Sequence, residues 1–264
     1  MPDAKVAAGR SPAVGVRGAG LVVTWLGHST ALIEIDGVRL LTDPVLGRNV
    51  GPLLRYAAMP AIPEGLDAVL LSHLHADHAD VRSLRSVAKS TPIIAPAGAG
   101  AWLARKGLAN AVELEPGEST RVGALSIRAT EAAHDGQRWR YGHVAGSVGY
   151  LATGTGSCYF AGDTDLFEGM HELAGLDVAL LPVAGWGPTL GPGHLDPERA
   201  ATAAQMIEPR IAIPIHWGTL GLPNRRRPPR EPAETFARLV AERAPQVEVR
   251  VLDPGERTVV EPRR

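Results

Sequence analysis

A run of three histidines and one aspartate constrains this chain more than any other feature. Residues 73–78 read His-Leu-His-Ala-Asp-His and directly follow an apolar stretch, residues 67–71, that is typical of a buried strand. Polar groups clustered at a strand end cost desolvation free energy unless something binds them. A divalent metal ion would bind them, because imidazole nitrogens and carboxylate oxygens are the ligands expected for zinc, and also for iron or manganese.

The spacing within this run separates its polar side chains into two pairs. In an extended segment, residues two positions apart point to the same side, so His73 and His75 can converge on one ion. Asp77 and His78 fall beyond the strand end, where a turn can direct them toward a second ion nearby. The alternative is a solvated loop of structural histidines, but this density of ligand types after a buried strand favours metal binding.

Three further polar residues end apolar stretches elsewhere in the chain. His134 follows an alternating, strand-like run, Asp163 ends the run Cys-Tyr-Phe-Ala-Gly, and His216 ends the run Ile-Ala-Ile-Pro-Ile. Each stands where a predicted strand gives way to a loop. Because two ions need more ligands than residues 73–78 supply, these three residues are the candidates that complete the site.

These residues carry a resemblance to a known family. The run HLHADH, followed in order by His134, by Asp163 in FAGDTD and by His216 in PIHWGT, resembles the motif pattern of the metallo-β-lactamase superfamily. Asp43 in LTDP is similar to the family's first motif, an aspartate that braces the histidine loop without touching the ions. The resemblance runs from about residue 22 to about residue 220, nearly the whole chain.

Within this superfamily the chain is more similar to one branch, which holds the N-acyl-phosphatidylethanolamine-hydrolysing phospholipase D and the L-ascorbate-6-phosphate lactonase. The matching strings are WLGHST, LTDP, AGDT, GHLDPE and IHWGT, and the phospholipase is the nearer match. Residues 185–193 keep the position of a substrate-lining loop but depart from the branch in sequence. This segment therefore gives no support to a lipid substrate.

The resemblance implies a site for two divalent ions, with Zn²⁺ expected and Mn²⁺ or Fe²⁺ as alternatives. One ion would be held by His73, His75 and His134, the other by Asp77, His78 and His216, with Asp163 as a bridge. The pKa of a water bound between the ions would fall toward about 7, which supplies a nucleophile at neutral pH. Asp77 is therefore also a candidate catalytic residue.

Two histidines outside this set are candidates for a role beside the metals. His194 stands in a loop that enters a helix, because Asp196 is a suitable N-cap and Pro197 suits the first helical position. Since such loops line the mouth of this fold, a catalytic or substrate-orienting role is favoured over a plain solvent-exposed histidine. His28 ends a strand, and either supports the ligands at the metal-facing edge or belongs to an ordinary turn. Both readings of His28 stay open.

Four other polar residues are interpreted as structural or exposed. His143 lies within a strand-like run and His171 on a presumed helix. Asp80 and Asp165 are expected to be helix caps or surface groups. None of the four is placed in the site.

The composition is typical of a compact enzyme. The chain has 264 residues, and 45% of them are hydrophobic, enough for a sizeable core. Lysine and arginine (27) balance aspartate and glutamate (28), so no overall field attracts nucleic acid or an anionic membrane. The single cysteine, Cys158, lies in an apolar run without a partner, which favours a reducing, cytoplasmic location.

Residues 1–20 are expected to be a disordered leader, because they lack the apolar core of a signal peptide. No stretch approaches the roughly 20 apolar residues that a membrane span needs. Residues 21–264 are then expected to form one metallo-β-lactamase-like domain. A homo-oligomer stays open.

The predicted elements alternate in a way that favours an α/β fold. Strands are expected over residues 22–26, 31–35, 38–42, 67–71, 93–95, 111–114, 126–130, 147–153, 157–161, 178–183, 211–215 and 247–252. Helices are expected over residues 81–89, 100–106, 166–174, 197–207 and 232–243. The first three strands form a meander, and strands and helices then alternate. This order fits the four-layer αβ/βα sandwich that the resemblance implies, with the metals along one open edge.

The leading functional hypothesis is a two-metal hydrolase acting on a small-molecule or lipid-like ester. A phosphodiester is the favoured substrate from the nearer resemblance, and a lactone or other carboxylic ester is the alternative. A tRNA-maturation endonuclease is disfavoured, because the chain has no long basic insertion to hold RNA. A diiron redox or sensing protein is the alternative of another class, since the ligands do not exclude iron.

Two insertions are expected to set specificity. Residues 44–63 are rich in proline and glycine and follow directly on Asp43, so they could form a lid. Residues 224–230 carry four arginines between prolines and could meet a substrate phosphate, although a basic loop is more often solvated surface.

Overall fold

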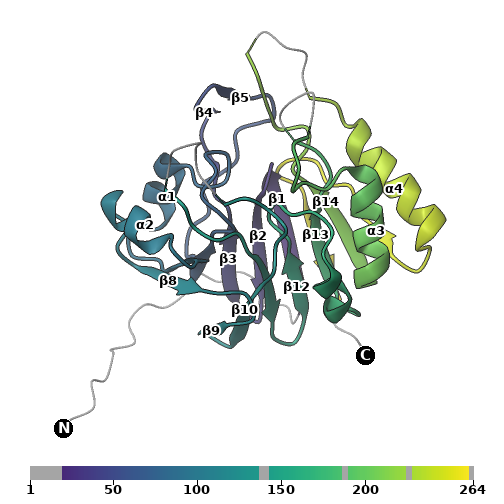
Figure 1. Cartoon of the computed structure of the whole chain (residues 1–264), viewed down its shortest axis with the longest axis horizontal. Coiled ribbons are helices and arrows are strands. Elements are labelled where there is room, and N and C mark those ends of the chain that lie inside the picture. The colour runs from purple at the N-terminus through teal and green to yellow at the C-terminus, as the bar shows by residue number, and fades with distance from the viewer. Residues whose placement is uncertain (1–19, 137–142, 186–189, 224–227, 262–264) are drawn as a thin grey trace.

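Two β-sheets packed face to face form the centre of the molecule, and helices cover the outer face of each sheet (Figure 1). The computed structural model describes residues 20–136, 143–185, 190–223 and 228–261. The layers run helices, sheet, sheet, helices, so the predicted four-layer αβ/βα sandwich is confirmed. The expected leader lies outside the described residues, apart from Gly20.

The first sheet has the strand order β17-β1-β2-β3-β6-β7-β8. Its strands are β1 (Leu21–Gly27), β2 (Thr30–Ile35), β3 (Val38–Thr42), β6 (Ala68–Leu70), β7 (Ile93–Pro96), β8 (Ala111–Leu114) and β17 (Arg257–Val260). Strands β1 to β3 form the predicted antiparallel meander, whereas β3, β6, β7 and β8 run parallel. As a result β1 points the same way as β3 and β6, and the carboxyl ends of all three meet at one edge.

Two short helices, α1 (Val81–Val87) and α2 (Gly100–Arg105), cover the outer face of this sheet (Figure 1). Leu84 of α1 and Trp102 and Leu103 of α2 pack in one buried cluster with Val69, Leu71 and Ile93 from the strands or their ends. Helix α1 begins after Asp80, whose carboxylate accepts a hydrogen bond from the Ser83 N–H at 3.0 Å. The expected role of Asp80 as a cap is confirmed.

The second sheet has the strand order β16-β14-β13-β12-β11-β10-β9. Its strands are β9 (Ser119–Val122), β10 (Leu125–Thr130), β11 (Gly149–Thr153), β12 (Ser157–Phe160), β13 (Val178–Pro182), β14 (Ile211–Ile215) and β16 (Glu248–Val249). Strands β12, β13, β14 and β16 run parallel. Every residue of β13 and β14 is buried, as expected for parallel strands that are covered on both faces.

Helices α3 (Pro197–Ile207) and α4 (Glu231–Arg243) cover the second sheet and pack against each other. The alanine-rich face of α3 and Phe236 of α4 join the main core. Between the two sheets, Trp25, Tyr150 and Phe160 are fully buried, and the Tyr150 hydroxyl donates a hydrogen bond to the Leu71 carbonyl at 2.9 Å. The two sheets are thus joined close to the segment that carries the histidine run.

Part of the insertion over residues 44–63 forms a third, small sheet. Strands β4 (Asn49–Val50) and β5 (Leu53–Arg55) form a hairpin, and β5 pairs with β15 (Leu220–Gly221). Arg55 anchors this hairpin, because its guanidinium donates hydrogen bonds to the carbonyls of Leu26, Val45 and Gly47. Burial lowers the pKa of Arg55 to about 10, which leaves it charged at neutral pH. The first half of this insertion is therefore a hairpin anchored to the rest of the fold, and its role as a lid stays a prediction.

Several predicted elements differ from the structure in extent or type. The expected helix over residues 166–174 is a 3-10 helix, η1 (Glu168–Leu173), and His171 lies exposed on it. The expected strand 247–252 shortens to β16, and β9 and β17 were not predicted. His143 lies outside the described strands, beside Arg105, so its placement in a strand was wrong. None of the helices in the described residues has the length and apolar character that a bilayer crossing requires.

Candidate metal centre

The candidate ligands all leave carboxyl ends of strands at one edge of the sandwich. Residues 73–78 follow β6, and Asp43 follows β3 in the first sheet. His134 follows β10, Asp163 follows β12 and His216 follows β14 in the second sheet. Strands β10, β12 and β14 point the same way, because β11 runs antiparallel to its two neighbours. The predicted residues are therefore brought together by strand direction.

The first group consists of His73, His75 and His134, whose ring nitrogens lie within 4.8 Å of one another. His134 donates its Nδ1 proton to the Gly193 carbonyl at 2.7 Å, which leaves the Nε2 lone pair toward His75 Nδ1, 3.1 Å away. His73 Nδ1 lies 2.9 Å from Ser72 Oγ. Its Nε2 is buried and has no hydrogen-bond partner in the described part of the chain. The group thus turns three ring nitrogens toward a common centre, and one of them, His73 Nε2, has no hydrogen-bond partner among the described residues.

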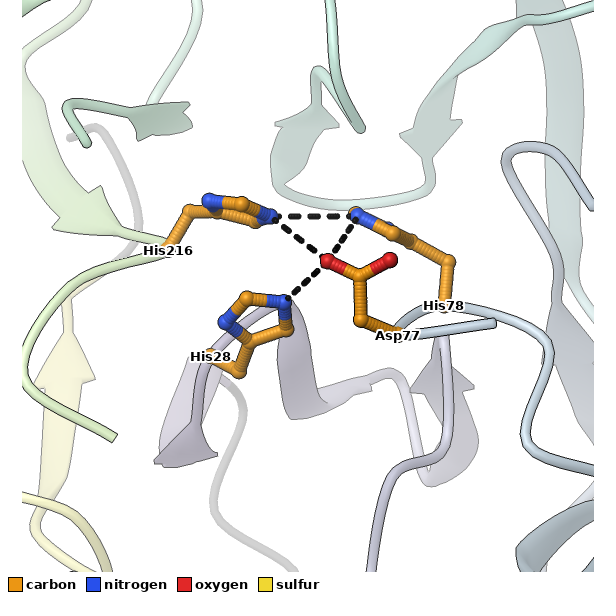
Figure 2. A group of neighbouring side chains, drawn as sticks. All are labelled: His28, Asp77, His78 and His216. Carbon is orange, nitrogen blue, oxygen red and sulfur yellow. Dashed lines mark hydrogen bonds and ion pairs between the residues drawn. The ribbon is translucent and has the colours of Figure 1, made fainter. Parts of the chain in front are cut away.

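The second group consists of His28, Asp77, His78 and His216, which also lie within 4.8 Å of one another (Figure 2). His78 Nε2 and His216 Nε2 are 3.1 Å apart, and Asp77 Oδ2 is 3.8 Å from each of them. His216 donates its Nδ1 proton to the Ala184 carbonyl at 2.6 Å, so its lone pair is on Nε2. This group supplies both nitrogen and oxygen ligand types.

Asp163 lies between the two groups and is almost fully buried, with 3% of it exposed. Its Oδ2 is 3.1 Å from His78 Nε2, and its Oδ1 is 3.4 Å from His216 Nε2. One of the carboxylate oxygens also lies within 4.8 Å of a ring nitrogen of His134, which belongs to the first group. Oδ1 is another buried atom that lacks a hydrogen-bond partner among the described residues. This position suits a bridge between two ions.

Asp43 is fully buried behind the histidine run and holds it in place. Its Oδ2 accepts hydrogen bonds from His78 Nδ1 at 2.7 Å and from Ser72 Oγ at 2.5 Å. Its Oδ1 accepts a hydrogen bond from the Ser72 N–H at 2.7 Å. The sequence placed Asp43 beside the ligands rather than on a metal, and this placement stays a prediction, because Asp43 also forms a possible ligand group with His73 and His78. Ser72 was missed, although its position next to His73 at a strand end was a usable signal.

His194 lies at the exposed side of the site, with 23% of its side chain accessible. Its Nε2 is 3.4 Å from Asp163 Oδ2, and its ring packs edge-on to that of His134. The predicted helix entry is confirmed, since Asp196 accepts a hydrogen bond from the Arg199 N–H and Pro197 begins α3. The structure thus brings His194 to the metal-ligand candidates.

His28 joins the second group, which the sequence had left undecided. Its ring is buried, and its Nε2 lies 3.1 Å from Asp77 Oδ2. Asp165, by contrast, forms an ion pair with Arg199 near the surface, as expected for a structural group. His171 and Asp80 likewise lie outside every candidate ligand group of the described residues.

Burial prepares three rings of the site as neutral ligands. It lowers the pKa of His134 to about 4 and that of His216 to about 3, and it holds the pKa of His73 well below the usual value. At neutral pH these rings are uncharged and keep a lone pair for a ligand bond. Because of these low pKa values, a proton does not compete with a metal ion for the ring lone pairs at neutral pH.

The carboxylates act in the opposite direction at His78. Burial disfavours a charged ring there, but Asp163 and Asp77 outweigh burial and raise the pKa of His78 well above its usual value. Burial likewise opposes the charge of Asp163, but His216 and His78 outweigh it and hold the pKa of this carboxyl well below its usual range. Positive charge is therefore required beside these carboxylates, from a proton on His78 or from a metal ion.

The donor set fits divalent metal ions. His78 and His216 each give their Nδ1 proton to an acceptor, so in their neutral forms, which a bound metal requires, the two rings would turn Nε2 lone pairs toward each other across 3.1 Å. Two nitrogens bound at about 2.0–2.1 Å to one tetrahedral ion stand about 3.3 Å apart. The first group repeats this spacing between His75 and His134. A cation at each centre would satisfy the facing lone pairs and the orphaned atoms of His73 and Asp163.

Comparison with known proteins gives the same family as the site. A family model described as a β-lactamase superfamily domain matches residues 38–217. A metal-dependent hydrolase of Methanopyrus kandleri is 36% identical over 243 residues, covering 89% of this chain and 97% of that protein. The N-acyl-phosphatidylethanolamine-hydrolyzing phospholipase D 1 of Caenorhabditis elegans is 32% identical over 230 residues, covering 76% of this chain and 64% of that enzyme.

A solved structure agrees at the level of the fold. Igni18, a metallo hydrolase from the archaeon Ignicoccus hospitalis, superposes with a TM-score of 0.70 at 24% identity, covering 91% of this chain and 98% of that one. The similarity to the phospholipase agrees with the resemblance found in the sequence, and it covers 64% of that enzyme. Since the family model spans well over half of the chain and a relative matches along nearly its full length, the chain belongs to the metal-dependent hydrolases of the metallo-β-lactamase superfamily.

Proposed function

We propose that this chain is a two-metal hydrolase of ester bonds, with a phosphodiester as the favoured substrate. The observation that carries the proposal is the convergence of two ligand groups on either side of Asp163, with ring nitrogens facing each other at 3.1 Å. Zn²⁺ is the first candidate for both ions, because the ligands are imidazoles and carboxylates with no thiolate among them.

The residues divide the work of such a reaction between them. Two bound divalent ions would lower the pKa of a shared water toward about 7 and neutralise the charge that develops on the ester oxygens. Asp163 would contribute to both ions, since its oxygens face His78 and His216 of the second group and the carboxylate also lies within 4.8 Å of the His134 ring nitrogen of the first group. Asp43 would keep the His78 ring in one tautomer and orientation by accepting its Nδ1 proton.

His194 is the proposed contact with the substrate. Its side chain is 23% exposed, and its Nδ1 faces the Gly191 and Pro192 carbonyls at 3.1 Å. These contacts fix the ring with Nε2 directed into the site. From this position Nε2 could hold or deliver a proton at the leaving oxygen of an ester.

The phosphodiester preference rests on similarity to the phospholipase branch. The C. elegans relative is an N-acyl-phosphatidylethanolamine-hydrolysing phospholipase D, so its substrate class is the first to test. Lactones and other carboxylic esters form the alternative class, because the same two-metal chemistry serves both kinds of centre. A reducing, cytoplasmic location is part of the proposal, because Cys158 is the single cysteine of the sequence and has no partner for a disulfide within it.

The test combines metal analysis with a substrate screen. Protein purified without chelator is expected to carry two equivalents of divalent metal per chain and to hydrolyse a simple phosphodiester, N-acyl-phosphatidylethanolamine or a lactone. Chelation should abolish turnover, and added Zn²⁺ should restore it. Iron in place of zinc, with redox activity and no ester turnover, would instead support the diiron alternative. Turnover that survives complete metal removal would contradict the proposal.

A further inference from the structure

Among the residues that the structure describes, His28 is the one buried imidazole at this edge that the proposed ligand set does not use. It is 1% exposed, and its Nε2 lies 3.1 Å from Asp77 Oδ2. We propose that His28 is a positioning residue, which donates a hydrogen bond from Nε2 to Asp77 and so fixes this carboxylate on the second ion. The inference rests on the proposed function for the presence of that ion.

The arrangement of the rings separates His28 from the other members of its group. Figure 2 shows Asp77 Oδ2 between the His28 ring on one side and the facing nitrogens of His78 and His216 on the other. The ring of His28 packs against that of His216, with their centroids 3.9 Å apart. His28 is thus behind the carboxylate, in the position of a supporting donor.

The candidate ligands share a pattern into which His28 fits. His78 is held through its second nitrogen by Asp43, His216 by the Ala184 carbonyl and His134 by the Gly193 carbonyl. Within the described residues, the side-chain hydrogen bond to Asp77 comes from His28 alone. Carboxylates that bind metals are themselves normally held by hydrogen bonds. His28 therefore does for Asp77 what Asp43 does for His78.

The backbone of His28 is fixed from both sheets. Its N–H donates to Thr219 Oγ1 at 2.8 Å, and its carbonyl accepts from Trp25 Nε1 at 2.9 Å and from the His216 N–H at 3.0 Å. The residue adopts a φ of 54°, in the left-handed region that non-glycine residues rarely occupy. Such a conformation persists where the surroundings over-determine it, often at a functional site.

Gly27 makes this turn possible. Its φ is 105°, and a Cβ on it would stand 2.9 Å from Thr219 and 3.0 Å from the Arg55 guanidinium. The turn between β1 and β2 is therefore held against the third sheet, and the imidazole of His28 starts from a fixed point. A ring held in this way can orient a carboxylate with little loss of its own freedom.

Three substitutions at His28 separate hydrogen bonding from packing. His28→Gln can place an amide N–H where Nε2 now lies, whereas the shorter side chain of His28→Asn does not reach Asp77. His28→Phe keeps the ring against His216 but has no donor. All three variants place a Cβ at the same positive φ. Asparagine tolerates this region best, so His28→Asn is the variant without a hydrogen bond to Asp77 that is most expected to fold.

The readout is Zn²⁺ affinity by competition with a chelator, together with the visible spectrum of Co²⁺-loaded protein. His28→Asn and His28→Phe are expected to weaken one ion by about 10- to 100-fold and leave the other unchanged. His28→Gln should stay within a few-fold of wild type, and its Co²⁺ spectrum should match that of the wild type.

Each other outcome overturns the inference in a recognisable way. If His28→Gln weakens the ion as much as the other two and alters the Co²⁺ spectrum, His28 is itself a ligand. If no variant changes either affinity, the residue only packs. If wild-type protein binds fewer than two ions, the proposed function fails first, and this is seen without any variant.

Discussion

The two ligand groups at the sheet edge are built differently. In the first group His75 and His134 are partly exposed, and the three ligand candidates are all imidazoles. In the second group every histidine is buried, a carboxylate joins them, and the buried charge of Asp43 supports His78. His134 of the first group packs against the ring of the partly exposed His194, so the first group lies on the more exposed side of the site.

This difference assigns separate tasks to the two groups. A buried carboxylate that accepts the Nδ1 proton of a ligand raises the basicity of that ring and strengthens its bond to an ion. The second group is therefore expected to hold its ion mainly through fixed charge. The first group, braced by a hydroxyl and a carbonyl, is expected to be the side at which substrate meets the metals.

Removing Asp163 should affect both ligand groups alike, and it should have the largest effect on metal occupancy and turnover. Since its carboxylate lies beside His78 and His216 of the second group and beside His134 of the first, Asp163→Ala should lower the occupancy of both ions together and cut turnover by at least about 100-fold. Metal content and kcat/KM measure the two effects. Asp165→Ala is the matched control, because it removes a nearby carboxylate that pairs with Arg199 instead. Full metal stoichiometry in Asp163→Ala would contradict the bridging role.

Replacing His194 tests whether the more exposed side of the site contacts substrate. His194→Ala is expected to keep both ions but to lower kcat by about 100-fold, the loss expected for a positioned acid or base. Separate measurement of kcat and KM is needed, since a rise in KM alone would indicate uniform binding of substrate. The exposed His171 supplies the control variant His171→Ala. Loss of one metal equivalent would instead make His194 a ligand.

Substitution at Asp43 should affect the second group more than the first. Asp43→Asn keeps the size of the side chain but removes the charge that holds His78, so the second ion should weaken by about 10- to 100-fold. Competition titrations that resolve the two ions measure this asymmetry, and thermal unfolding checks that the fold is intact. Equal weakening of both ions would show that Asp43 supports the histidine run as a whole. Unchanged affinity and turnover would rule out its supporting role.

The sequence predicted the clustered half of the site better than the dispersed half. Residues 73–78 are recognisable by density alone, because all their ligand types follow one strand. His134, Asp163 and His216 are single residues on three separate strands, and only their order in the chain, through a family resemblance, identified them. Spatial convergence of such residues depends on strand direction, which local patterns do not carry.

His28 shows how much further the sequence could have been read. Three successive strands in a meander must alternate in direction, so the end of the first lies at the same edge as the end of the third. Because Asp43 ends the third strand, His28 belonged at the metal-facing edge on sequence grounds. This argument from strand direction would have favoured the metal-facing edge over an ordinary turn for His28.

The elements that were missed are short or depend on distant partners. Strands β4, β5 and β15 have two or three residues each, too few for a period to be detected. Strand β17 pairs with β1, more than two hundred residues earlier in the chain, and this pairing leaves no local signal. The 3-10 helix η1 has ordinary helical residues, and its tighter winding was not visible in them.

Ser72 is hydrogen-bonded to His73 of the first group and to Asp43, which supports the second group, and its substitution is expected to have the smallest effect on metal affinity. Its hydroxyl donates to Asp43, which can only accept, and therefore accepts the Nδ1 proton of His73. One side chain thus supports His73 directly and His78 through Asp43. Ser72→Ala loses these bonds but keeps the Ser72 N–H bond to Asp43.

A net hydrogen bond contributes about 0.5–1.5 kcal/mol, which corresponds to roughly a 2- to 10-fold change in affinity. Ser72→Ala should therefore weaken both ions by a similar small factor, whereas Asp43→Asn weakens mainly one. Ser147→Ala is the matched control, because the buried hydroxyl of Ser147 has no hydrogen-bond partner among the described residues. If Ser72→Ala affects one ion only, the two groups are independently braced, and the contrast between them extends to their supports.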